Sequence, residues 1–249
     1  MATGFAGKRG LGWVLLASWL IPVLMTLAYI ILMATSETDN TGKAWESVGL
    51  GFVFVLWYLF RLLTSTAAIT RAVVVADADR VLELADRELG KRWRAATRAP
   101  FHGYRAIAFE LRGDWSSALA ALDHPDMAKA PARTRVLAAT VRVGALAETG
   151  NAADAHAAYD AALTGRVPDP QLVPLVRLAE ARMRWADGKL DEAEPLLARL
   201  VDDVRAGVGT RGVAHYYLAR IADARGDAAA ARRHRQRAKE LAPNTWVAG

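Results

Sequence analysis

Residues 212–243 read GVAHYYLARIADARGDAAAARRHRQRAKELAP, two helical runs on either side of Gly226. Ala231 follows this glycine by five residues. The same pair recurs upstream as Gly113 with Ala118, Gly150 with Ala155 and Gly188 with Ala193, and successive glycines are 37, 38 and 38 residues apart. A fixed period of roughly 20 to 50 residues is typical of a solenoid, whose units stack their apolar faces on their neighbours.

Each of these glycines is predicted to end one helix and begin a turn into the next, because glycine adopts the left-handed conformation at low cost. The residue after it opens the second helix, and aspartate or asparagine there is suited to capping. These residues are Asp114, Asn151, Lys189 and Asp227. The sequence therefore predicts four helical hairpins, 101–112 with 115–122, 132–149 with 152–163, 171–187 with 190–204 and 212–225 with 228–241.

The last unit resembles a tetratricopeptide repeat (TPR). The family's small residue of the first helix falls on Ala219, the turn glycine on Gly226, the small residues of the second helix on Ala231 and Ala238, and the terminal proline on Pro243. The resemblance covers residues 100–243, with longer connections than the family's unit of about 34 residues. It implies an all-α solenoid, here assigned to residues 99–249, that binds protein partners.

The composition indicates a chain that is part membrane-bound and part globular, since 53% of its 249 residues are hydrophobic and 23% are charged. Residues 11–33 carry no charge and are long enough to cross a bilayer, which needs about 20 apolar residues. Residues 45–63 form a second apolar stretch with Glu46 and Arg61 near its ends. We expect residues 1–71 to form a two-helix transmembrane hairpin; a buried core helix is the alternative for the second stretch.

Basic residues near the spans predict the orientation, because they favour the cytoplasmic side. Lys8 and Arg9 precede the first span, and Arg61 and Arg71 flank the end of the second. Only six of the 32 basic residues are lysine, and alanine is abundant, which is typical of a GC-rich bacterial genome. The expected location is thus a bacterial inner membrane, with both termini cytoplasmic.

Residues 72–98 connect the anchor to the repeats. A helical stripe of Val74, Ala78, Val81, Leu84 and Ala85 is predicted to cover the first repeat. The following basic run, Lys91, Arg92, Arg94 and Arg98 around Trp93, fits either contact with anionic headgroups or a solvated linker.

No catalytic constellation is recognisable. The absence of cysteine excludes disulfides, thiolate zinc sites and cysteine nucleophiles. The five histidines lack the spacing that places two ligands on one helical face, so no metal is expected. His102 and His215 both precede their marker glycine by eleven residues, which indicates a repeated packing position. No cofactor or small-molecule substrate is expected either.

The inner groove of a tetratricopeptide array is lined mainly by first helices, and the resemblance places the lining positions about ten, six, three and two residues before each glycine. They are Gly103, Ile107, Glu110 and Leu111; Thr140, Gly144, Ala147 and Glu148; Leu178, Arg182, Trp185 and Ala186; Tyr216, Arg220, Asp223 and Ala224. Arg182 and Arg220, with Trp185 and Tyr216, suit an acidic or C-terminal peptide. The alternative is that the aromatic rings pack and the arginines are solvated.

The last predicted helix is rich in arginine, but Asp223, Asp227 and Glu240 interleave with its basic residues. A polar cap of the solenoid is preferred to a nucleic-acid surface. The expected function is a membrane-anchored, non-catalytic scaffold or assembly factor that binds protein partners. The alternative is an accessory subunit of a membrane enzyme or transport complex, whose spans make the main contacts.

Overall fold

The computed structural model describes residues 40–164 and 169–248, which form helices and connections without any β-strand. The prediction of an all-α chain is confirmed for these residues. The chain divides into two compact units, residues 1–67 and residues 68–249, and their boundary falls within α2 (Asn40–Val74).

Only one of the two expected membrane spans lies within the described residues. The first, 11–33, lies outside the described residues, and the second, 45–63, lies within α2. Within the described ranges, no helix combines the length and the apolar character that crossing a bilayer requires.

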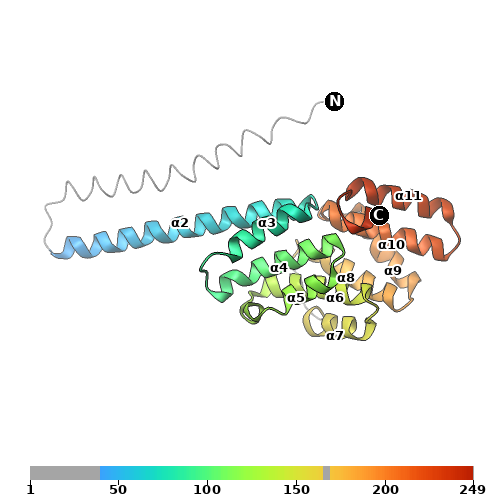
Figure 1. Ribbon diagram of the computed structural model, residues 1–249, viewed down its shortest axis with the longest axis horizontal. Helices are drawn as coiled ribbons and strands as arrows, with labels where there is room; N and C mark the ends of the chain where they lie inside the picture. Colours follow the sequence, from blue (N-terminus) through green and yellow to red (C-terminus); the bar gives the residue numbers. More distant parts are fainter. Residues whose placement is uncertain (1–39, 165–168, 249) are drawn as a thin grey trace, which may run out of the picture. The chain divides into compact units, whose positions relative to one another are not determined.

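The second unit contains the end of α2 (residues 68–74), α3 (Ala78–Leu89) and four helical hairpins (Figure 1). The hairpins are α4 (Ala95–Arg112) with α5 (Trp115–Leu122), α6 (Ala132–Glu148) with α7 (Ala152–Ala162), α8 (Val173–Ala186) with α9 (Leu190–Asp202), and α10 (Val208–Ala224) with α11 (Ala228–Leu241). Two short 3-10 helices, η1 (Pro125–Lys129) and η2 (Trp246–Ala248), follow the first and last hairpins.

The four turn glycines have the predicted left-handed conformation. Their φ angles are 76° at Gly113, 78° at Gly150, 75° at Gly188 and 77° at Gly226. Asp114, Asn151 and Asp227 cap the following helices by accepting a hydrogen bond from the backbone N–H three residues later. Lys189 makes no such bond, because its side chain lacks an acceptor.

In two hairpins, the first helix begins earlier than the sequence pattern predicts. Helix α4 starts at Ala95 and continues through Pro100, which removes one backbone hydrogen bond. Ala99 and Phe101, on either side of this proline, are fully buried, so their packing outweighs the lost bond. Helix α10 starts at Val208 and includes Gly209 and Gly212.

Helix α3 packs against α4, as predicted for the connecting segment. Its buried face includes Ala78, Val81, Leu84 and Ala85. Val74 does not belong to this stripe, since it is the last residue of α2 and is largely exposed. The turn at residues 75–77 separates α2 from α3, so the helical periodicity that grouped Val74 with the α3 residues is interrupted.

The last hairpin returns to the first. A Cβ at Gly209 of α10 would lie 3.2 Å from the Ala76 Cβ and 3.4 Å from Leu111 Cδ2 of α4. A Cβ at Gly113 would lie 2.9 Å from the Cβ of Trp246, in the segment after α11. The inner face of the four hairpins is therefore closed by contact between the first hairpin and the C-terminal part of the chain.

Candidate functional site

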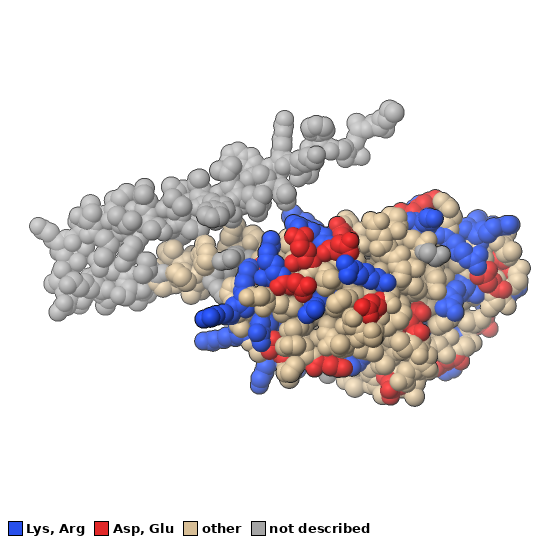
Figure 2. All heavy atoms as spheres, in the orientation of Figure 1, with Lys and Arg blue, Asp and Glu red and all other residues tan. Residues whose placement is uncertain are grey.

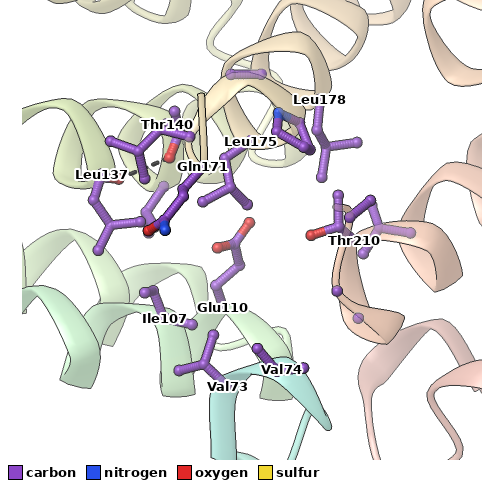
Figure 3. Close-up of a pocket in the computed structure, with 18 of the residues that line it drawn as sticks. Val73, Val74, Ile107, Glu110, Leu137, Thr140, Gln171, Leu175, Leu178 and Thr210 are labelled. Carbon is purple, nitrogen blue, oxygen red and sulfur yellow. Dashed lines mark hydrogen bonds between the residues drawn. The ribbon is translucent and has the colours of Figure 1, made fainter. Parts of the chain in front are cut away.

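A cavity of about 530 Å³ lies on this inner face. Its walls come from the end of α2 and from the first helix of every hairpin, and Trp246 also lines it. Most of the lining surface is apolar, and its aliphatic side chains include Val73, Ile107, Leu137, Leu175, Leu178 and Val213. Figure 3 shows the Glu110 carboxylate among these side chains, pointing into the cavity toward Leu175.

Several positions that the TPR resemblance placed on the inner groove do line this cavity, namely Ile107, Glu110, Leu111, Thr140, Leu178 and Arg182. Helix α10 contributes Gly209, Thr210 and Val213, whereas the predicted Tyr216 and Arg220 are not among the lining residues. This shift follows from the contact of the α10 N-terminal turns with the first hairpin, which brings those turns to the cavity.

An ion pair joins two of these helices inside the fold. Arg182 of α8 donates through Nη1 to Oε1 of Glu110 on α4, 72 residues away in sequence. The Arg182 side chain is 2% exposed and that of Glu110 is 16% exposed. A Cβ at Gly144 of α6 would overlap with Arg182 Nη1 and would lie 3.2 Å from Glu110 Oε1. Gly144 therefore provides the space in which the pair forms.

Arg182 has unused hydrogen-bonding capacity. Its Nε and Nη2 atoms are buried and have no hydrogen-bond partner in the described structure. The guanidinium Cζ lies 5.8 Å from the ring centroid of Tyr217, within the range of a cation–π contact. The interpretation of Arg182 as a solvated arginine does not hold, because the structure buries it.

A second polar contact lies beside this pair. The Tyr217 hydroxyl of α10 donates to Glu148 at the end of α6. Burial raises the pKa of Glu148, and the charges of Arg182 and Arg220 partly offset this rise. Two polar contacts, one between α4 and α8 and one between α6 and α10, thus join the four inner helices in pairs.

Arg220 lies in a different environment, on an aromatic platform. Its Cζ is 4.1 Å from the ring centroid of Trp185 and 5.7 Å from that of Tyr216. Tyr216 in turn packs edge-on against Trp246, with the ring centroids 4.7 Å apart. Arg220 is exposed, and it forms no ion pair with a carboxylate among the side chains that the structure describes. We call Arg220, Trp185 and Tyr216 the arginine–aromatic platform.

The structure therefore separates the two arginines that the sequence placed together. Arg182 is buried against Glu110, while Arg220 remains exposed with Trp185 and Tyr216. The two environments are adjacent, since the Trp185 and Tyr217 ring centroids are 5.2 Å apart. Glu110 and Gly144 were among the predicted lining positions, but spacing alone did not indicate their contact with Arg182.

A cluster of metal-ligand residue types was missed by the sequence analysis. His102, His124 and Asp126 each offer one possible ligand atom, a ring nitrogen or a carboxylate oxygen, and these three atoms lie within 4.8 Å of one another. Helical spacing did not indicate this cluster, because His124 and Asp126 come from the loop and η1 after α5. Arg98 contacts both Asp126 oxygens, at 2.7 Å and 2.9 Å, and lowers the pKa of this carboxyl. Asp126 already has a cationic partner, which favours a structural role for the cluster.

The equivalent histidine of the fourth hairpin is also buried and paired. His215 and His234 approach within 2.9 Å through their Nδ1 atoms, so one ring donates and the other accepts. Burial and the neighbouring His234 lower the pKa of His215 to about 4. The predicted packing position is confirmed in that both His102 and His215 are buried.

Charges of both signs are interspersed on the surface of the second unit. On the face shown in Figure 2, acidic side chains lie among the basic ones. On α11, Arg235 pairs with Asp223 and Arg237 pairs with Glu240. These arginines of the last helix are thus partly neutralised within the protein.

Comparison of the chain with protein-family models, with curated proteins and with solved structures finds no match.

Proposed function

We propose that this chain is a membrane-anchored helical-repeat scaffold that recruits an acidic segment of a protein partner and catalyses no reaction itself. The arginine–aromatic platform is the contact for that segment. The TPR resemblance of the hairpins supports a role in protein binding.

The proposal is based on the exposure and the stacking of the Arg220 side chain. Its guanidinium is exposed and held over Trp185, yet it has no carboxylate partner among the described residues. Stacking on an aromatic ring restrains an arginine side chain. Nη1 of Arg220 also contacts the Tyr216 hydroxyl at 3.5 Å, and the other N–H groups remain available to a carboxylate. A restrained guanidinium loses less entropy on binding than a freely rotating one.

The membrane part of the proposal rests on the apolar stretch at 11–33 and on the surface of α2. Phe52 and Phe54 of α2 are 62% and 68% exposed, and Val55, Leu59 and Leu63 are also exposed. Exposed apolar side chains of this number on one helix mark a surface that lipid or another protein covers.

We place the anchor in a bacterial inner membrane with both termini in the cytoplasm. A reporter fused after Gly249 should then be active in the cytoplasm, and periplasmic activity would refute this orientation.

The test of the platform is charge reversal, Arg220→Glu, in the full chain within intact membranes. Proteins crosslinked to the chain are captured and quantified by mass spectrometry. We expect the recovered partner to fall about tenfold, which corresponds to about 1.4 kcal/mol of binding free energy. Arg199→Glu, an exposed arginine of α9, is the matched control and should leave recovery unchanged. Equal recovery with both variants, at unchanged helicity, would rule out the platform as the binding surface.

The exposed apolar residues of α2 also favour the second candidate, an accessory subunit whose anchor contacts a membrane enzyme or transporter. Replacing residues 1–67 by an unrelated anchor separates the two functions. Retained partner recovery supports the scaffold. Loss of recovery, with the repeat unit still folded, supports the accessory subunit.

A further inference from the structure

The cavity on the inner face has the size and chemistry of a small-molecule site, distinct from the exposed platform. Its volume of about 530 Å³ falls within the roughly 300–1,000 Å³ of ligand pockets. Such sites combine apolar walls with a few polar groups that orient the ligand. Here the wall surface is mainly apolar, and Glu110 and Arg182 meet within it.

Glu110 supplies an acceptor that faces the cavity. Its Oε1 is occupied by Arg182, whereas no donor from the described residues is bonded to Oε2. The carboxylate points into the space between the aliphatic side chains (Figure 3). Beside it, the buried Nε and Nη2 of Arg182 lack acceptors. A buried donor without a partner is destabilising, so an acceptor brought by a ligand would recover part of the lost free energy.

Charge balance limits the ligand's polar group to a neutral one. Arg182 and Glu110 already neutralise each other, so a charged head group would leave one uncompensated charge in an apolar cavity. The charges of the two exposed arginines of the lining are neutralised as well, since Arg133 pairs with Asp169 and Arg205 pairs with Asp203. A hydroxyl group satisfies these conditions, because it donates one hydrogen bond and accepts another without carrying charge.

We propose that this cavity binds an aliphatic alcohol, with its hydroxyl donating to Glu110 Oε2 and its hydrocarbon chain packed between α4, α6, α8 and α10. The hydroxyl also offers an acceptor to Arg182. A membrane lipid alcohol and a soluble long-chain alcohol share this chemistry.

The experiment uses the full chain in lipid nanodiscs and three photoreactive probes with the same ten-carbon chain. The probes carry a diazirine in the chain and end in a hydroxyl, an ammonium or a carboxylate group. Labelled peptides are identified by mass spectrometry. We expect the alcohol to label the cavity residues of α4, α6, α8 and α10 at least about fivefold more than either charged probe. Excess 1-decanol should suppress this labelling. Equal or stronger labelling by a charged probe would overturn the proposal.

Two variants test the position of the ligand. Leu175→Trp fills the cavity from a partly exposed leucine and should reduce cavity labelling about tenfold. Leu119→Trp makes the same change at a partly exposed leucine of α5 outside the cavity lining and should leave labelling unchanged. Labelling that survives Leu175→Trp, with the fold intact by circular dichroism, would refute the cavity as the site.

Glu110→Gln tests the head group. It removes the negative charge, leaves Arg182 without its counterion and should raise labelling by the carboxylate probe several-fold relative to the alcohol. An unchanged ratio of carboxylate to alcohol labelling would show that Glu110 does not select the head group. Because partner recovery through Arg220 is measured separately, failure here is distinguishable from failure of the scaffold proposal. The source of a natural alcohol is identified by extracting the purified protein and comparing bound compounds with the lipid of the membrane.

Discussion

Gly144 shows how the absence of one side chain allows a long-range contact. It lies within α6, where glycine is less favourable than alanine by about 0.5–1 kcal/mol. The space it leaves is occupied by the Arg182 guanidinium and the Glu110 carboxylate. The local loss in helix stability is thus coupled to the formation of a buried ion pair.

We therefore predict that Gly144→Ala destabilises the repeat unit by about 1–3 kcal/mol, the usual range for overpacking, despite the better helix propensity of alanine. Chemical denaturation followed by circular dichroism measures the change. In an Arg182→Met background the overlap is relieved, so the same substitution should be neutral or stabilising. Equal effects in both backgrounds would show that Gly144 does not act through Arg182.

At the scale of elements, the four hairpins share one turn conformation but differ in what surrounds it. The φ angles of the turn glycines span only 75° to 78°. A Cβ at Gly188 would meet no atom within 4 Å, whereas a Cβ at Gly113 would lie 2.9 Å from Trp246. The same glycine thus has a conformational role in every turn and an additional packing role in the first.

This difference predicts unequal effects of one substitution. Gly188→Ala should cost about 1–2 kcal/mol, the penalty for a left-handed non-glycine residue. Gly113→Ala should cost more, because it also displaces Trp246. Thermal melting of the two variants compares them, and Gly188→Asn should recover part of the loss, since asparagine tolerates this conformation. A Gly113→Ala variant no less stable than Gly188→Ala would contradict the packing role.

At the scale of the whole repeat unit, the segment after α11 holds the array closed. The Trp246 ring packs edge-on against Trp115 of the first hairpin and Tyr216 of the last, with centroid distances of 5.1 Å and 4.7 Å. In an open solenoid each repeat contacts only its neighbours, so the ends can unfold separately. Contact between the ends couples the first and last hairpins.

Trp246→Ala should therefore lower the free energy of unfolding by about 2–4 kcal/mol. This is at most the cost of truncating a fully buried aromatic side chain to alanine. It should also increase hydrogen exchange of both α4 and α10, although they belong to the first and last hairpins. Increased exchange confined to α10 and α11 would show that Trp246 does not couple the two ends. Trp246→Phe preserves an aromatic contact and serves as the conservative control.

Local sequence determined the hairpins of this protein. Helical periodicity, capping aspartates and four glycines act within a few residues, so they fixed the turns and most helix ends without reference to the rest of the chain. The repeat also placed Glu110, Gly144 and Arg182 on the inner face. The sequence pattern did not predict the early starts of α4 and α10, where packing against distant residues overrides local signals.

Tertiary structure decided what those inner residues do. Closure of the array turned an expected groove into a cavity, because α10 and Trp246 pack against the first hairpin. The same folding paired Arg182 with Glu110 and left Arg220 exposed on Trp185. Two arginines at equivalent repeat positions acquired different environments, since burial and ion pairing depend on contacts between helices that are far apart in sequence.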